Sequence, residues 1–386
     1  MTRIVVCGAL ANKPANGGNA WTRLSWLLGF QRLGFDVSFV EQIAAASCVD
    51  ESGRVVPFEA SSNLAYFRGV TEQFGIAHAA ALVCDANGPI YGMTHSELAD
   101  LASDADLLFN ISGHLQDPLR RRFRRSVFFD DDPGYTQFWW DQRSPGVRLD
   151  GYDYWYTIGE NLGAPGCPIP SADIPWRSIR VPVTLDDWPV CIDGDRTRFS
   201  TVATWRGPYG PLHYHGTTYG LKVHEFRKII QLPCRVPLQF ELALDIHPSE
   251  VNDLAALKAN RWRLVDPRQV AGGPEQFRRY VQTSGAECSV AQGMYVATRS
   301  GWFSDRTVRY LASGKPVLVQ DTGFSQNYPV GDGLIAFRTI DEAVSGAERI
   351  AANYDHHAQA ARALAERYFD ARQVMTRLCD EIGIAA

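Results

Sequence analysis

The chain opens with Arg3-Ile-Val-Val-Cys-Gly8, a short apolar run that ends in glycine. A loop rich in glycine, asparagine and proline follows at 11–19, and residues 20–33 place their apolar side chains on one broad face, as in an amphipathic helix. Gly34 suits the left-handed conformation that often ends a helix, and a second apolar run occupies 37–40. This order of strand, helix and strand predicts a β-α-β unit and therefore a parallel sheet.

The same alternation continues to the end of the chain. In the N-terminal half, the expected strands are 81–84, 107–111, 127–129 and 154–158, and the expected helices include 96–102 and 118–125. In the C-terminal half, the expected strands are 199–204, 238–244, 288–291 and 316–320, and the expected helices are 221–231, 251–260, 275–282, 305–312, 342–353 and 355–383. Both halves therefore predict the α/β class, each with a doubly wound sheet.

A chain of 386 residues exceeds the size that one hydrophobic core usually supports. The stretch 181–196 is rich in proline and aspartate and lacks periodicity, which is typical of an interdomain linker. We therefore predict an N-terminal domain at 1–180, this linker, and a C-terminal domain at 197–355.

Composition and charge exclude several functional classes. The formal net charge of −5 at pH 7 provides no field that attracts a nucleic acid. The apolar runs are shorter than the roughly 20 residues that span a membrane, and Met1 leads into the first strand without a signal-peptide pattern. We therefore expect a cytoplasmic protein that binds neither a nucleic-acid polymer nor a membrane.

The segment that carries most chemical information is Thr298-Arg-Ser-Gly-Trp-Phe-Ser-Asp-Arg-Thr-Val-Arg-Tyr-Leu-Ala-Ser-Gly-Lys-Pro-Val-Leu-Val-Gln-Asp-Thr-Gly-Phe324. Ser304 and Asp305 stand where a helix N-cap belongs, so the amides of Arg306 and Thr307 would face the preceding loop without helical partners. Such a helix N-terminus attracts anions.

The flanks of this helix add further binding groups. Gly301 allows the loop to approach a ligand closely, and Arg306 offers a guanidinium that pairs with a diphosphate. Asp321 and Thr322 follow the next strand, where loops of an α/β sheet line the ligand crevice. A capped helix between two loops also has a purely structural interpretation, and these residues alone leave both open.

The order of these features is similar to the donor-binding element of GT-B glycosyltransferases. The shared pattern is a small loop, a polar residue that opens a helix, the helix end Leu311-Ala-Ser-Gly-Lys-Pro-Val317, and then Asp321-Thr-Gly323. Further familiar blocks are Trp205-Arg-Gly207, Leu242-Ala-Leu-Asp-Ile-His247 and Ala286-Glu287. Over nearly its full length the chain resembles a bacterial branch of this superfamily, the family 1-like glycosyltransferase group 1.

The resemblance implies two facing Rossmann-like domains with an interdomain cleft, and a C-terminal segment, 356–386, that packs back toward the N-terminal domain. It implies transfer of a sugar from a nucleoside-diphosphate sugar to a small-molecule acceptor, natural-product-like or saccharide, without a metal or another cofactor. The expected donor-binding residues are Arg206, Glu287, Gly301, Ser304, Asp305, Arg306, Thr307, Asp321 and Thr322. Many retaining members carry a pair of glutamates in this element; the pair is missing here, so the sequence leaves the stereochemistry open.

Candidate catalytic residues follow two N-terminal strands. His114 comes after the strand at 107–111, with Gly113 beside it, and Asp132 ends a run of three aspartates after the strand at 127–129. Three adjacent carboxylates cannot all be buried and charged, so at least one is expected to face the cleft, where like charge raises a pKa. We predict His114 and Asp132 as the catalytic pair, with structural roles as the alternative.

The acceptor side of the cleft is expected to include the first loop, Asn16, Gly17, Gly18 and Asn19, together with Tyr135 and Glu160. The loop lacks the GxGxxG spacing of a dinucleotide site, and Glu41 alone does not supply that function. A simple turn is the alternative for this loop. Two alternative functions remain: a nucleotide-sugar epimerase or phosphorylase on the same fold, and a non-catalytic nucleotide-sugar-binding protein.

Overall fold

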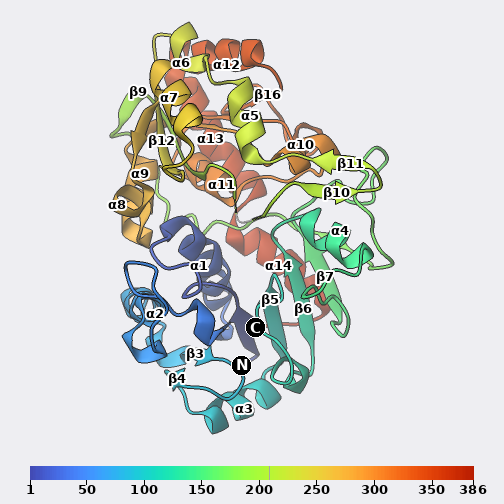
Figure 1. Ribbon diagram of the computed structural model, residues 1–386. Helices are drawn as coiled ribbons and strands as arrows, with labels where there is room; N and C mark the ends of the chain where they lie inside the picture. The colour runs from blue at the N-terminus through green and yellow to red at the C-terminus, as the bar shows by residue number, and fades with distance from the viewer. Residues whose placement is uncertain (208) are drawn as a thin grey trace.

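The computed structural model describes residues 1–207 and 209–386, and it contains two α/β halves, each built on its own sheet (Figure 1). The first sheet has the strand order β4-β3-β2-β1-β5-β6-β7-β8, in which only β4 is antiparallel to its neighbour. Its strands are β1 (Arg3–Cys7), β2 (Asp36–Ile43), β3 (Ala80–Cys84), β4 (Ile90–Tyr91), β5 (Leu107–Ile111), β6 (Ser126–Asp130), β7 (Tyr154–Thr157) and β8 (Arg177–Ser178). Its helices are α1 (Gly17–Arg32), α2 (Ser62–Gln73), α3 (His95–Asp104) and α4 (Tyr135–Asp141).

The second sheet is parallel throughout and has the order β13-β12-β9-β14-β15-β16. Its strands are β9 (Asp195–Thr204), β12 (Gln239–Asp245), β13 (Arg263–Val265), β14 (Ser284–Ser289), β15 (Val317–Gln320) and β16 (Leu334–Phe337). A separate hairpin consists of β10 (Leu212–Tyr214) and β11 (Thr217–Tyr219). The helices are α5 (Lys222–Lys228), α6 (Leu232–Arg235), α7 (Val251–Ala259), α8 (Pro267–Ala271), α9 (Pro274–Gln282), α10 (Gly293–Thr298), α11 (Asp305–Ala312), α12 (Ile340–Ala352), α13 (Tyr354–Tyr368) and α14 (Ala371–Ile382).

Each sheet has a point where the chain reverses its direction of winding. In the first sheet, the chain moves from β1 to β2 and β3 on one side and then continues with β5 on the other. In the second sheet, β9 is followed by β12 and β13 on one side and by β14 on the other. In doubly wound folds, ligands bind outside the carboxyl ends of the strands at these switch points.

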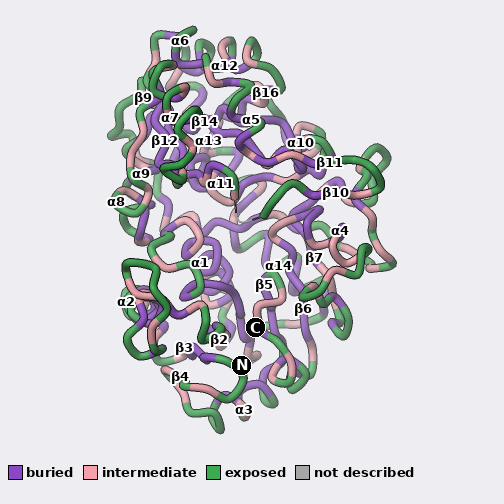
Figure 2. Tube along the Cα trace, viewed as in Figure 1, coloured by how far each residue is buried: buried purple, intermediate pink, exposed green. Residues whose placement is uncertain are grey.

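The two halves share a continuous apolar core. One cluster joins Trp21 and Trp26 of α1 to Tyr310 of α11 and Met375 of α14. Figure 2 shows the central strands of both sheets and much of α1 as buried. Figure 1 shows the red helix α14 lying beside the first half, and a side chain at Gly29 of α1 would collide with Met375, 2.3 Å from its sulfur. The end of the chain is thus packed tightly against the first helix.

Two helical predictions were wrong. The expected helix at 118–125 is only a 3₁₀ turn, Arg120–Arg122, because Arg120 turns inward to pair with Asp117 and lies over the ring of Tyr152. The expected helix at 355–383 is broken between α13 and α14. At the break Val183, in the segment expected to be a linker, donates its amide to the carbonyl of Phe369 at 2.8 Å and accepts the amide of Ala371 at 2.9 Å.

No helix among the described residues has both the length and the apolar character needed to cross a membrane.

Candidate functional site

A cleft of about 820 Å³ lies between the two halves. Its walls contain the carboxyl ends of β6, β9, β12 and β13 and the first residues of α5 and α11. The charged side chains along it are Lys13, Arg23, Asp131 and Asp132 from the first half and Lys222, Asp245, Asp266, Arg268, Asp305 and Arg306 from the second. Strand ends and helix N-termini from both sheets thus converge on one space.

The second half contributes the N-terminus of α11 to this cleft. Asp305 is its first residue, and its carboxylate accepts hydrogen bonds from Thr22 at 2.6 Å and from Arg309 at 2.9 Å. Burial opposes the charge on Asp305, but Arg309 and the Thr22 hydroxyl hold its pKa below the ordinary value. The helix therefore begins with an ionised side chain that is already paired. The first backbone amides of α11 point out of its N-terminus, which is the end that lies at the cleft.

Arg306 and Glu287 form a buried ion pair behind this helix end. Nε of Arg306 donates to Oε1 of Glu287 at 2.6 Å, and Nη1 donates to the carbonyl of Val202 at 2.9 Å. The Glu287 side chain has no exposed surface, and its Oε2 has no hydrogen-bond partner among the described residues. Glu287 therefore holds Arg306 in place at the cleft wall without lining the cleft itself, and its expected part in donor binding stays a prediction.

The remaining residues of this segment lie beside the cleft. Ser304 and Thr307 border a small void next to Trp302. A side chain at Gly301 would come within 2.8 Å of Asn161, whose amide donates to the carbonyl of Arg299 at 2.8 Å. The close approach that Gly301 permits is thus to a loop of the first half.

Three predicted donor residues have other partners and do not line the cleft. Asp321 pairs with Arg338 at 2.6 Å, and Thr322 donates to the carbonyl of Trp302 at 2.5 Å. Arg206 forms a two-point ion pair with Glu250. These contacts give each of them a structural role in the protein, and their contribution to donor binding stays a prediction.

Sequence reasoning missed Lys222, the first residue of α5, which lines the cleft near Arg306. Burial and the charge of Arg306 lower its pKa to about 8, although Asp132 and Asp305 oppose the shift. The sequence did show this lysine near the start of the helix expected at 221–231. In the chain, however, the β10–β11 hairpin lies between β9 and this helix, so the sequence did not indicate that the lysine reaches the cleft at the end of β9.

The three consecutive aspartates divide between a structural and a cleft-facing role. Asp130 is buried and accepts hydrogen bonds from Thr136, Gln137 and Thr157, and burial raises its pKa to about 6. Asp131 and Asp132 line the cleft. Burial and the neighbouring Asp131 raise the pKa of Asp132, and its Oδ1 accepts the hydroxyl of Tyr295 at 2.5 Å. The expectation that at least one aspartate faces the cleft is met by two.

His114 lies near this wall without lining the cleft. Burial, Arg23 and Lys13 lower its pKa to about 4, and Asp131 opposes the shift. The imidazole is therefore neutral at neutral pH and only a weak base. Its catalytic role remains a prediction.

The first loop is held from both sides. Asn16 caps α1 by accepting the amide of Asn19 at 3.0 Å, and both residues line the cleft together with Gly18. A side chain at Gly17 would lie 2.1 Å from the carbonyl of Gly273, so this glycine is required by contact with the other half.

Glu41 fixes the start of the same loop. Its buried carboxylate accepts the amides of Leu10, Ala11 and Asn12 at 2.6 to 2.8 Å. Burial raises its pKa to about 7, and these amides oppose the shift. The sequence analysis considered Glu41 only as part of a dinucleotide site, whereas the structure shows that it fixes the backbone of the first loop.

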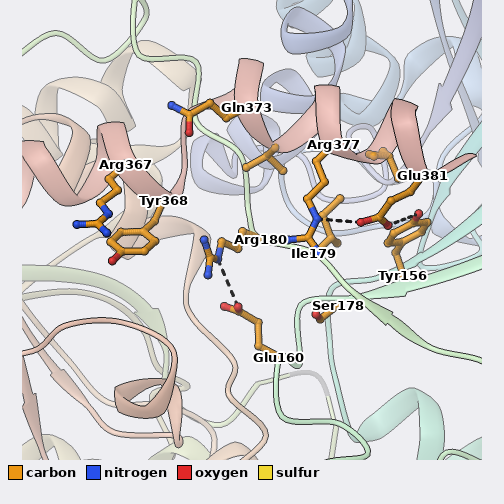
Figure 3. A pocket seen from close by; sticks show the side chains of 12 residues that line it. Tyr156, Glu160, Ser178, Ile179, Arg180, Arg367, Tyr368, Gln373, Arg377 and Glu381 are labelled. Carbon is orange, nitrogen blue, oxygen red and sulfur yellow. Dashed lines mark hydrogen bonds and ion pairs between the residues drawn. The ribbon is translucent and has the colours of Figure 1, made fainter. Parts of the chain in front are cut away.

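Tyr135 and Glu160, both expected on the acceptor side, are placed differently. Tyr135 packs against Trp139, Tyr209 and Tyr295 at the boundary of the two halves, and does not line the cleft. Glu160 borders a second cavity of about 190 Å³ beside α14, where it pairs with Arg180 at 3.3 Å (Figure 3). Figure 3 also shows Arg377 and Tyr156 directed toward Glu381, so the charges of this second cavity are largely paired with one another.

Within the described part of the chain, no group of three or more histidine, cysteine, aspartate or glutamate side chains is arranged to hold a metal ion.

Comparisons with known proteins identify the fold. No protein-family model matches the sequence, and no curated protein matches it. Among solved structures, alpha-glucosyltransferase in complex with UDP is similar with a TM-score of 0.62 at 11% identity, covering 100% of both chains. HepE from Anabaena in complex with UDP and glucose gives 0.59 at 12% identity, over 99% of this chain and 100% of that one. Sucrose-phosphate synthase from Thermosynechococcus elongatus gives 0.56 at 13% identity, over 99% of each chain. The chain therefore has the GT-B fold, with two Rossmann-like halves that face each other across a cleft.

Proposed function

We propose that this chain is a glycosyltransferase that moves a sugar from a nucleoside-diphosphate sugar to a small-molecule acceptor in the cleft between its halves, without a metal ion. The observation that carries the proposal is the convergence of three positive features on the second-half wall. These are the N-terminus of α11, the guanidinium of Arg306 and the ammonium of Lys222. The diphosphate of the donor would bind there.

The chemistry of the transfer requires these groups. As the bond between the anomeric carbon and the diphosphate oxygen breaks, negative charge develops on the leaving diphosphate. Positioned cations and backbone amides that stabilise this charge lower the barrier, and they do most in a site that excludes water. Arg306 is suited to this task because Glu287 and Val202 already fix its orientation.

The opposite wall supplies the groups for the acceptor. Asp132 lines the cleft, and burial together with Asp131 raises its pKa, which makes it a better proton acceptor than an ordinary aspartate. We therefore assign to Asp132 the contact with the acceptor hydroxyl. His114, neutral and nearby, would act as a hydrogen-bonding group rather than as the main base.

The nucleotide is proposed to be uridine diphosphate. The solved structures of alpha-glucosyltransferase and HepE with this fold contain UDP, which supports the choice of UDP as the first nucleotide to test. Because one fold serves many substrates, dTDP, GDP and ADP are titrated in the same experiment as the alternatives to UDP.

The experiment is calorimetric titration of the protein with each nucleotide and its sugar forms, followed by measurement of nucleotide release with a panel of hydroxylated acceptors. Lys222→Met is expected to weaken binding of the preferred diphosphate at least about tenfold, the scale of one lost charged hydrogen bond. The matched control is Lys228→Met, at the far end of the same helix, where the lysine is paired with Glu225 outside the cleft.

The outcomes separate the proposed activity from its rivals. Nucleotide release that depends on an acceptor alcohol supports a transferase. Conversion of the donor without an acceptor indicates an epimerase, and release that needs phosphate indicates a phosphorylase. Tight binding without turnover indicates a binding protein, and absence of binding to any of the four nucleotides would exclude all of these functions.

A further inference from the structure

The first-half wall of the cleft contains a buried arginine with incomplete pairing. Arg23 of α1 has a relative exposure of only 4% and lines the cleft. Its two polar contacts are long: Nη2 lies 3.4 Å from Asp131, and Nη1 lies 3.5 Å from the carbonyl of Asn19. Its Nε has no hydrogen-bond partner among the described residues. A buried cation with such weak partners is costly to keep unless a ligand completes its hydrogen bonds.

Arg23 also lies where a ligand is expected. A side chain built at Gly8, just beyond β1, would come within 3.2 Å of Cγ and 3.3 Å of Nε of Arg23, and within 3.3 Å of Ile111 at the end of β5. β1 and β5 are the two strands at which the first sheet reverses its winding. The guanidinium therefore crosses the switch point of this sheet, the usual ligand position in a doubly wound fold.

The surroundings of Arg23 favour an acidic ligand. Lys13 lines the same wall, and within the described residues no ion pair involves it. The two carboxylates nearby have partners of their own, because the Ser112 hydroxyl donates to Asp131 and the Tyr295 hydroxyl donates to Asp132. Arg23 is thus the buried group of this wall whose hydrogen bonds are incomplete, and the exposed Lys13 adds a second positive charge beside it.

Apolar side chains lie on the facing wall of the cleft. Trp302 and Ile246 of the second half line it and are partly exposed, whereas Trp26, Phe129 and Ile158 of the first half are buried behind the charged groups. This combination of an apolar surface and an incompletely paired cation suits a molecule with a hydrocarbon or aromatic body and one acidic group.

We propose that Arg23, assisted by Lys13, binds a carboxylate or phosphate group of the acceptor, so that the acceptor is an acid rather than a neutral sugar or aglycone. The inference rests on the proposed function, because it assigns the second substrate of that reaction. Anchored at Arg23, the acceptor would direct its hydroxyl toward Asp132 and the donor site on the opposite wall.

The first test observes Arg23 directly. In protein labelled with ¹⁵N-arginine, the Nε–H signal of Arg23 is identified by its loss in Arg23→Lys. Phenylacetate and phenylphosphate, titrated in the presence of saturating UDP, are expected to shift this signal saturably, whereas the neutral 2-phenylethanol leaves it unchanged. An unchanged signal with both acids would overturn the inference. The same titration is repeated without UDP. A shift that occurs only without UDP would also overturn the inference, because Arg23 would then bind the donor diphosphate.

The second test uses variants and separates this inference from the proposed function. Arg23→Met is expected to lower affinity for the two acids by about tenfold to a hundredfold, the range for a hydrogen bond to a charged group, while UDP affinity stays unchanged. Arg32→Met is the matched control, since it lies on the same helix and pairs with Asp187 outside the cleft. Loss of UDP binding in Arg23→Met would overturn the acceptor assignment. The assignment would also be overturned if the unmodified protein preferred UDP-glucuronate to UDP-glucose and Arg23→Met lost this preference, because Arg23 would then bind the donor sugar. Absence of UDP binding in the unmodified protein would instead refute the transferase proposal itself.

Discussion

The hydroxyl of Thr22, in the first helix of the N-terminal half, donates a hydrogen bond of 2.6 Å to Asp305, the first residue of α11 in the C-terminal half. This bond joins the helix that follows the first loop to the helix whose N-terminus faces the proposed donor diphosphate. A second bond between the halves lies next to it, from Nε1 of Trp21 to the carbonyl of Pro274 at 2.9 Å. The position of α11 relative to α1 is therefore set by directional contacts as well as by apolar packing.

Replacement of Thr22 by valine removes the bond to Asp305 while keeping the shape of the side chain. We expect the free energy of unfolding to fall by about 1.5–3 kcal/mol, because the lost hydrogen bond is to a charged group. The control is Thr71→Val, which removes a buried hydroxyl whose bond, to the carbonyl of Phe67, lies within α2. Urea denaturation of both variants tests this, and an equal or smaller loss for Thr22→Val would contradict a special role for the contact between the halves.

Removal of Arg306 leaves the fully buried carboxylate of Glu287 without its partner. We expect Arg306→Met to lower the free energy of unfolding by about 3–5 kcal/mol, the cost of breaking a buried pair from one side. The double variant Arg306→Met, Glu287→Leu is expected to recover most of this stability but not the binding of UDP. If the double variant binds UDP like the unmodified protein, Arg306 has no part in the donor site.

The charge of Lys222 gives donor binding a pH dependence. Burial and Arg306 lower its pKa from the ordinary 10.5 to about 8, so the ammonium is lost as the pH rises through about 8. Calorimetry from neutral pH to about pH 9.5 is expected to show UDP affinity falling across this window. Lys222→Met should remove the dependence and Lys228→Met should keep it; the same slope in all three proteins would assign the titration to another group.

The same shift predicts an opposite effect on stability. The unfolded chain keeps the proton of this lysine up to about 10.5, whereas the folded protein releases it near 8. Burial of the charged form therefore costs stability below pH 8, and this cost disappears as the pH rises from 8 to 10.5. Chemical denaturation should therefore show that the free energy of unfolding of the unmodified protein rises relative to that of Lys222→Met between pH 8 and pH 10.5.

Gly17→Ala tests the packing of the first loop against the second half. The added carbon would lie 2.1 Å from the carbonyl of Gly273, so we expect the two helix ends to separate, with a loss of about 1–3 kcal/mol, as for overpacked sites. Gly69→Ala in α2 is the matched control, since nothing lies within 4 Å of its added carbon, and alanine there should stabilise the helix by up to about 1 kcal/mol. Thermal unfolding measures both, and similar melting temperatures for the two variants would contradict the close contact.

Local patterns predicted the elements that depend on nearby residues. The helix expected at 305–312 is α11 with the same bounds, because its apolar side and the left-handed Gly314 that follows it are encoded within the segment itself, although Ser304 makes no side-chain capping bond. The helix expected at 118–125 failed because a basic run carries no information about Asp117 and Tyr152, which draw Arg120 inward. The break between α13 and α14 was likewise invisible, since it depends on Val183, far away in the chain.

The sequence by itself determined the α/β class, the two sheets and the segment that begins α11, because apolar periodicity and helix caps act over a few residues. Which charged side chains share the cleft was decided only by the tertiary structure. Lys222, Arg23 and Asp132 come from three distant segments, and Asp321 and Arg206, both expected in the donor site, are paired elsewhere with Arg338 and Glu250. The physical reason is that ion pairing depends on distance in space, which is set only when the two sheets place their strand ends opposite each other. A local sequence pattern contains no information about that distance.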